Sequence, residues 1–111
     1  NMFYQAIQFN QSLNSWDVSE VTNMAGMFRG AKAFSGNIGD WDVQKVTNFT
    51  ATFMDADSFN SDISNWKTNS ATNMSSMFAN SDIFNKDISS WNVSSVTNME
   101  QMFGNADSFN I

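Results

Sequence analysis

The 111-residue sequence contains no cysteine and no histidine. Without cysteine, neither a disulfide framework nor a zinc–thiolate site can form. The lack of histidine removes the commonest general base and the commonest metal ligand. No apolar run approaches the roughly 20 residues that a membrane-spanning helix needs, so we expect no direct membrane insertion by this segment.

Positive charge is also scarce. Five basic residues stand against 11 acidic ones, for a net charge of −6. Such a chain repels phosphate backbones, so we expect no nucleic-acid partner. Hydrophobic residues make up 41% of the sequence and aromatic residues 14%, which is sufficient for a folded core.

What the sequence has in abundance is repetition. Its tryptophans and nearly all its phenylalanines recur with a period of 25 residues, without insertion or deletion, in three columns: Trp16, Trp41, Trp66 and Trp91; Phe3, Phe28, Phe53, Phe78 and Phe103; Phe9, Phe34, Phe59, Phe84 and Phe109. A fixed period of this size is typical of a solenoid, in which each repeat buries its apolar residues against its neighbours. We therefore predict that residues 1–111 form a single solenoid segment of about four and a half 25-residue repeats, as part of a longer array.

Two shorter periodicities alternate within each repeat. Residues 16–19 alternate apolar and polar side chains, which predicts a short strand. Apolar residues then follow at helical spacing, at Met24, Met27, Phe28 and Ala31. Asn23 directly precedes these residues and is the expected N-cap of the helix. At the end of the helix we expect a residue in the left-handed conformation. That position of the repeat is occupied by Gly30, Asp55, Asn80 and Asn105. The predicted fold class is an α/β solenoid resembling a leucine-rich repeat, with one short parallel strand and one short helix per 25-residue turn.

These motifs resemble a known family. The segments WDVS at 16–19, VTNM at 21–24 and 96–99, and DIS at 62–64 and 87–89 resemble the 25-residue repeat of bacterial surface proteins, known from Mycoplasma lipoproteins and from Listeria and Bacteroidetes surface proteins. That family is related to the BspA-like leucine-rich repeats. The resemblance covers essentially the whole chain, and it implies an extracellular or cell-surface location and a role in adhesion, with no catalytic residue.

The outward positions of the predicted strands form a candidate binding face. Their residue types vary between copies while the apolar columns stay constant, as expected for a scaffold with a free surface. A solvated face without a partner would look the same. The candidate residues are Ser15, Asp17, Ser19, Asp40, Asp42, Gln44, Asn65, Lys67, Asn69, Ser90, Asn92 and Ser94.

Calcium is a second candidate ligand, and the only cofactor that the sequence suggests. Asp57, Asp82 and Asp107 share one column, and stacked carboxylates can be relieved of their repulsion by a hard cation. Alternatively, these aspartates are solvated residues of surface turns. Lys32 occupies the same column in the preceding copy, and the sequence has no glycine-rich calcium loop.

Two functions remain open. The first is a non-enzymatic extracellular or cell-surface module for adhesion or recognition of a protein or cell-surface partner. The second is a structural subunit or spacer of an extracellular fibre that self-associates through the solenoid ends. Phe3 and Phe9 at one end, and Phe103 and Phe109 at the other, would supply the apolar contact surfaces. We expect no enzyme, because the usual base and thiol nucleophile are missing.

The aromatic columns yield a first prediction. Trp66→Ala should lower the free energy of unfolding by about 3–5 kcal/mol, because it leaves a cavity in the core. Asp42→Ala, on the candidate binding face, should barely affect folding. Chemical denaturation of both variants tests this, and equal effects of the two substitutions would contradict a core role for the tryptophan column.

Overall fold

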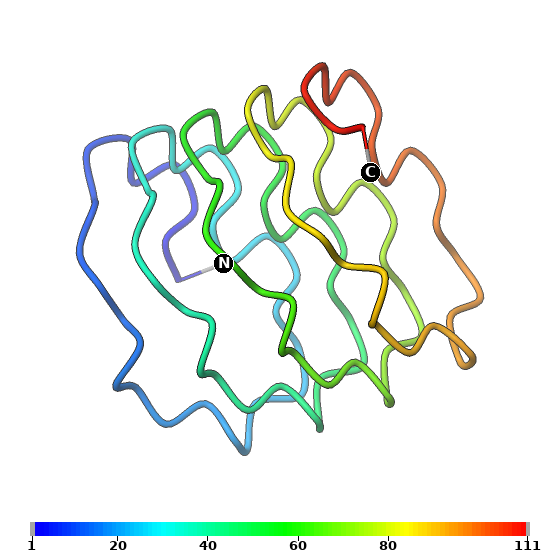
Figure 1. The fold of residues 1–111 in the computed structure, drawn as a ribbon. Helices are drawn as coiled ribbons and strands as arrows, with labels where there is room; N and C mark the ends of the chain where they lie inside the picture. The colour runs from blue at the N-terminus through cyan, green and yellow to red at the C-terminus, as the bar shows by residue number, and fades with distance from the viewer. Residues whose placement is uncertain (1, 111) are drawn as a thin grey trace.

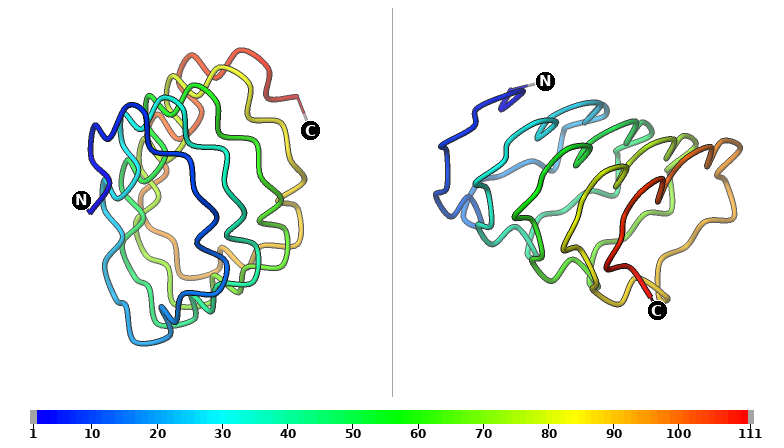
Figure 2. Two further views of the ribbon diagram at one scale, coloured as in Figure 1. Left: turned by 90° about the vertical axis from the view of Figure 1, so that its left-hand side faces the viewer. Right: turned by 90° about the horizontal axis from the view of Figure 1, so that it is seen from above.

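The computed structural model describes residues 2–110, which wind as a coil of successive 25-residue circuits (Figure 1). We call one circuit a rung. In both views of Figure 2, equivalent segments of neighbouring rungs lie side by side. The repeat period of the sequence is therefore the period at which the backbone returns over itself.

The predicted α/β fold is wrong. Residues 2–110 contain no helix and no strand of more than one residue. Their β-structure consists of isolated parallel bridges that join Asn23 to Asn48, Asn48 to Asn73 and Asn73 to Asn98. The structure is thus neither an α/β solenoid nor a leucine-rich-repeat fold with a strand and a helix per turn.

Left-handed residues explain why residues 24–31 do not form a helix. The Met27 N–H donates to the Met24 carbonyl at 3.1 Å, which closes a β-turn. The third residue of this turn, Gly26, has a φ of 63°, and Gly30, the third residue of the next turn, has a φ of 72°. A right-handed helix cannot accommodate a left-handed residue at every fourth position. The segment is therefore a series of β-turns.

Other copies adopt the same conformation without glycine. Seven non-glycine residues in these two columns have φ values between 53° and 58°: Gln5, Ala51, Asp55, Ser76, Asn80, Gln101 and Asn105. The column of Gly30 was predicted to be left-handed, and this is confirmed, although it ends no helix. The column of Gly26 was not predicted to be left-handed.

Backbone hydrogen bonds between rungs take the place of helical ones. Along residues 49–55, every second N–H donates to the carbonyl 24 residues ahead; for example, the Phe53 N–H lies 2.9 Å from the Met77 oxygen. Near the bridges the direction reverses, and the Thr47 N–H donates to the Thr22 carbonyl at 2.9 Å. Each rung therefore depends on its neighbours for its main-chain partners.

The asparagines of the bridge column also act differently from the prediction. There is no helix for them to cap. Instead, the Asn48 Oδ1 accepts from the Thr50 N–H at 2.9 Å, and the Asn73 Oδ1 accepts from the Ser75 N–H at the same distance. These are Asx turns, which hold the chain as it enters the left-handed segment.

The predicted strand is replaced by two further β-turns. The Trp41 N–H donates to the Ile38 carbonyl at 3.2 Å, and the Val46 N–H donates to the Val43 carbonyl at 3.0 Å. Trp41 and Val43 are nevertheless buried, and Asp42 between them is exposed. In this rung the alternation thus predicted burial correctly, although no strand is present; at the equivalent apolar positions of the outer rungs, Trp16 and Val93 are exposed.

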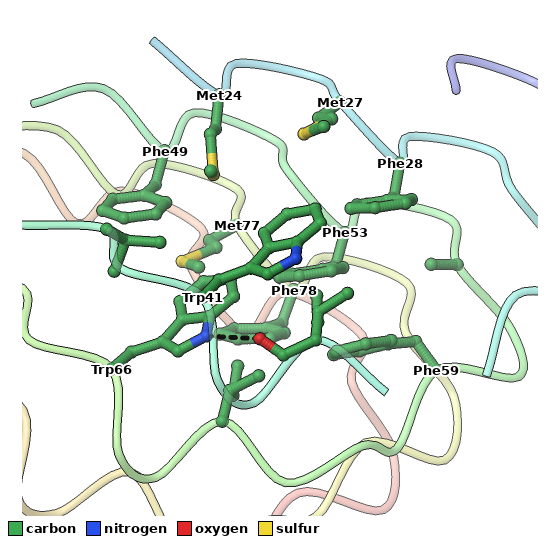
Figure 3. Packing of buried hydrophobic residues seen from close by; sticks show 14 of the residues in the cluster. Met24, Met27, Phe28, Trp41, Phe49, Phe53, Phe59, Trp66, Met77 and Phe78 are labelled. Carbon is green, nitrogen blue, oxygen red and sulfur yellow. Dashed lines mark hydrogen bonds between the residues drawn. The ribbon is translucent and has the colours of Figure 1, made fainter. Parts of the chain in front are cut away.

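The aromatic columns form the core, as predicted (Figure 3). The rings of Phe53 and Phe59 stack within one rung with centroids 4.0 Å apart, and Phe53 stacks on Phe78 of the next rung at 5.6 Å. Trp66 is 2% exposed, and its Nε1–H donates to the Ile38 carbonyl at 3.0 Å. The indole is therefore buried with its polar atom satisfied.

The left-handed column gives a second prediction. Ser76→Gly should raise the free energy of unfolding by about 0.5–1 kcal/mol, because relief of left-handed strain exceeds the added entropy of the unfolded chain. The 2.8 Å bond from the residue 76 N–H to the Glu100 carbonyl is retained. Ser75→Gly, next to it and without a positive φ, should destabilise the protein. Urea denaturation that finds both variants destabilised would contradict the assignment.

Candidate binding face

The twelve residues of the predicted binding face do come together on the surface. All are exposed except Ser19, which is partly buried. They fall into three columns that run across the rungs and begin at Ser15, Asp17 and Ser19. We call these twelve residues the polar face.

One column of the polar face has a structural role. The Asp17 Oδ1 accepts from the backbone N–H of Ser19 at 3.0 Å, and Asp42 accepts from the Gln44 N–H at 3.0 Å. Asn92 accepts from the Ser94 N–H at 2.9 Å. These side chains close Asx turns, so they are less available to a partner.

The third copy departs from this arrangement. Lys67 cannot accept a hydrogen bond. The following residue, Thr68, is fully buried and donates its hydroxyl to the Asn92 carbonyl at 2.9 Å. In the third copy, a hydrogen bond between neighbouring rungs therefore replaces the Asx turn that the other copies have.

The other two columns are freer. Within residues 2–110 the side chains of Gln44, Asn69 and Ser94 form no hydrogen bond. Asp40 accepts from the Asn14 Nδ2 at 2.6 Å. A partner would therefore meet unbonded amide and hydroxyl groups at these three positions, whereas the Ser19 hydroxyl of the same column donates to the Asp17 Oδ1 at 2.6 Å.

Charge is unevenly distributed over the polar face. Asp17, Asp40 and Asp42 lie in its first two copies, and Lys67 is the cation of the third. Hydrogen bonds from the side chain and the backbone of Ser19 lower the pKa of Asp17. One end of the polar face is thus acidic, while the other, with Ser90, Asn92 and Ser94, is uncharged.

The predicted calcium column is not assembled as a metal site. The Asp57 Oδ2 lies 3.0 Å from the Nζ of Lys32 in an exposed ion pair. This hydrogen bond, and the charge of Asp57, raise the pKa of Lys32. No group of three or more acidic side chains in the described part of the chain is close enough to hold a metal ion, so Asp82 and Asp107 remain surface carboxylates.

A neighbouring acidic column also serves turns. Asp62 accepts from the Ser64 N–H at 2.9 Å, and Asp87 accepts from the Ser89 N–H at 2.8 Å. Residues 2–110 enclose no pocket. They also contain no helix of the length and hydropathy that crossing a membrane requires.

The exposed apolar surface does not lie where the sequence predicted it. The outer phenylalanines were predicted to supply it at the two ends, but Phe3 and Phe103 are partly buried. Large apolar side chains are exposed at other positions, among them Met2 at 69%, Trp16 at 43% and Met99 at 44%. Each is the outermost member of an otherwise buried column, and that position in the column is the signal that identifies it.

The Asx turns give a third prediction. Hydrogen bonds lower the pKa of Asp17, Asp62 and Asp87. A lowered pKa in the folded state stabilises the fold above the unfolded value of about 3.9, and this contribution is lost as the pH falls through the folded pKa. The free energy of unfolding should therefore decrease below about pH 4.

Asparagine substitutions test this directly. The triple change Asp17→Asn, Asp62→Asn and Asp87→Asn keeps the turn acceptors but removes the titrating groups, so the acid dependence should become shallower. Asn92→Asp adds a titrating acceptor and should make it steeper. Urea denaturation across the acid range measures both, and unchanged slopes would contradict the prediction.

The chain matches one family model. The model described as "Mycoplasma protein of unknown function, DUF285" matches residues 1–111. This confirms the Mycoplasma part of the resemblance but does not extend to the BspA-like leucine-rich repeats. No curated protein and no solved structure matches the chain.

Proposed function

Since this chain belongs to the DUF285 family of Mycoplasma proteins, we propose that it is a non-enzymatic module for adhesion or protein recognition, displayed outside the cell. The observation behind this proposal is the polar face. Its side chains differ from copy to copy, while the stacked backbone beneath them keeps the same conformation.

Such a surface is suited to recognition. Each rung presents three exposed positions at a fixed spacing, because the rungs are joined by backbone hydrogen bonds of 2.8–2.9 Å along residues 49–55. A partner can therefore be matched by changing surface residues without changing the core. Repeat proteins commonly combine a constant core with an extended surface through which they bind.

The extracellular location is supported by the finer resemblance. The repeat motifs are similar to those of surface proteins from Mycoplasma, Listeria and Bacteroidetes, which are exported or anchored by lipid. The negative net charge of −6 favours a protein or cell-surface partner over a nucleic acid.

The absence of enzymatic activity is part of the proposal. The sequence has no histidine or cysteine to act as base or nucleophile. Asp17, Asp40 and Asp42, the acids of the polar face, are exposed on an open surface. Asp17 and Asp42 close Asx turns, and Asp40 accepts from Asn14. Catalysis by paired carboxylates requires a site that positions the substrate between them.

Binding by this face should be weak per contact. The twelve residues include no Trp, Tyr or Arg, which are the usual anchors of tight interfaces. Useful affinity would then come from many copies on one surface, since linked sites bind with a high effective concentration.

A cell-binding experiment with the labelled chain gives the fourth prediction. The triple variant Gln44→Arg, Asn69→Arg and Ser94→Arg adds bulk and charge to one freely exposed column. We expect it to reduce binding to cultured epithelial cells by about tenfold or more at sub-saturating concentration. Binding is measured by flow cytometry.

The matched control changes an exposed column elsewhere on the rungs, with Gln8→Arg, Ile83→Arg and Ser108→Arg. This variant adds the same charge and should bind as the unaltered chain does. Urea denaturation verifies that both variants fold. Equal loss of binding in the two variants, or no binding by the unaltered chain, would contradict the proposal.

A further inference from the structure

The sequence contains four Asn-X-Ser/Thr tripeptides, or sequons, which the proposed function does not use. They begin at Asn10, Asn48, Asn73 and Asn92. In a sequon, the side-chain nitrogen of the asparagine is the atom that accepts a sugar. Transfer requires that this nitrogen, and the hydroxyl group two residues later, are open to a glycosyltransferase. The fold treats the four sequons differently in this respect.

Asn92 begins the sequon that lies on the polar face. Asn92 and Ser94 are both exposed. The same two positions of the repeat are also exposed inside the coil, where Asp42, Gln44 and Lys67 occupy them with a rung on each side. The exposure of this sequon therefore comes from its position within the repeat and does not depend on which rung is outermost.

The side chain of Asn92 is held with its nitrogen free. Its Oδ1 accepts from the Ser94 N–H at 2.9 Å, which closes the Asx turn. Its Nδ2 has no hydrogen-bond acceptor among residues 2–110. The Ser94 hydroxyl has no hydrogen-bond partner among them either. The amide nitrogen and the hydroxyl group that define a sequon are thus both open on one turn.

The turn also favours the chemistry of transfer. N-glycosylation replaces one proton of Nδ2 with the anomeric carbon of a sugar. As this proton leaves, negative charge develops on the amide, and a hydrogen bond to Oδ1 stabilises that charge. The Ser94 N–H already supplies this hydrogen bond in the free chain. The Asn92 amide is therefore polarised in the direction that the reaction needs.

The main chain around Asn92 is tied mostly to itself. The Val96 N–H donates to the Val93 carbonyl at 3.0 Å, in a local turn. In the described part of the chain, no backbone–backbone hydrogen bond joins residues 92–95 to another rung. The Thr68 hydroxyl anchors the segment by donating to the Asn92 carbonyl at 2.9 Å. A transferase can therefore reach this sequon without breaking the main-chain pairing between rungs.

Two of the other sequons lie in the bridge column. Asn48 and Asn73 are partly buried, and a parallel bridge joins them. The Asn73 carbonyl accepts from the Phe49 N–H at 2.8 Å, so these sequons are part of the pairing between rungs. The Thr50 hydroxyl also donates to the Asn48 Oδ1 at 2.6 Å. The first of the two sequons therefore has its hydroxyl group occupied, and both have their main chain held.

The sequon at Asn10 is exposed but is held differently. The Asn10 Oδ1 accepts from the Ser35 N–H at 2.8 Å and from the Ser35 hydroxyl at 3.2 Å. Both donors belong to the next rung, and the amide of Ser12, the third residue of this sequon, is not among them. Of the four sequons, the one at Asn92 is thus the one that combines exposure with an Asx turn of its own.

We propose that Asn92 is a site of N-glycosylation, which takes a sugar activated as a diphosphate ester. The bond between the anomeric carbon and the diphosphate oxygen breaks, and a bond between this carbon and the Asn92 Nδ2 forms. The diphosphate leaves with the electron pair, and a base of the transferase takes the proton from Nδ2. The sugar is then carried on the polar face.

Peptide mass spectrometry of the chain produced in Mycoplasma cells tests this proposal. The purified chain is digested with chymotrypsin, and each sequon is examined for a sugar. We expect a sugar on Asn92 and none on Asn10, Asn48 or Asn73. The mass of the adduct identifies the donor, because nucleotide-linked donors transfer single sugars, whereas lipid-linked donors transfer a preassembled oligosaccharide.

Variants of two neighbouring serines provide the matched controls. Ser94→Ala removes the hydroxyl group of the sequon but keeps the N–H that donates to Asn92, so the sugar should be lost. Ser94→Thr keeps a hydroxyl group and should keep the sugar. Ser95→Ala changes an exposed serine outside the sequon and should also keep the sugar. Urea denaturation verifies that all three variants fold.

Three results would overturn the proposal. The first is an unmodified Asn92 in the unaltered chain. The second is a sugar on Asn48 or Asn73 to the same extent as on Asn92. The third is an equal response of the Ser94→Ala and Ser95→Ala variants. None of these results depends on whether the polar face binds a partner.

Discussion

The amide of one rung needs the carbonyl of the next, and the rest of the structure depends on this pairing. The Phe53 N–H, for example, has its partner 24 residues ahead, at Met77. A single inserted residue would misplace every later donor by one position, so the repeats keep one length. The same register places equivalent aromatic rings of neighbouring rungs on one another. The ring centroids of Trp41, Trp66 and Trp91 are 6.1–6.4 Å apart from one rung to the next. Main-chain pairing and aromatic packing therefore reinforce each other.

The sequence predicted which residues are buried better than it predicted the backbone. Met24, Met27 and Phe28 are buried, as the helical spacing indicated. However, β-turns closed every three or four residues also return side chains to one side, so this spacing does not distinguish them from a helix. The sign of φ decides between the two. Gly26 was the visible signal for a left-handed residue, whereas Ser76 in the same column gave none.

The positions of the polar face could also be predicted, but its chemistry could not. Alternation placed Asp17 and Asp42 on the surface, and they are exposed. Their roles as acceptors in Asx turns are seen only in the folded structure. The calcium column shows a related limit, because residues that share a column need not converge: no group of three acidic side chains within residues 2–110 is close enough to hold a metal ion. The proposed recognition through this face depends most on side chains that the fold leaves unbonded, such as Gln44.

The most direct test of this account is a scalar coupling across a hydrogen bond, measured by NMR on the isotope-labelled chain. The account predicts a coupling between the amide nitrogen of Phe53 and the carbonyl carbon of Met77, which are joined by the 2.9 Å inter-rung bond. A coupling from the Phe53 nitrogen to the carbonyl of Phe49, four residues earlier, is the signature of a helix. That result would contradict the coil of β-turns.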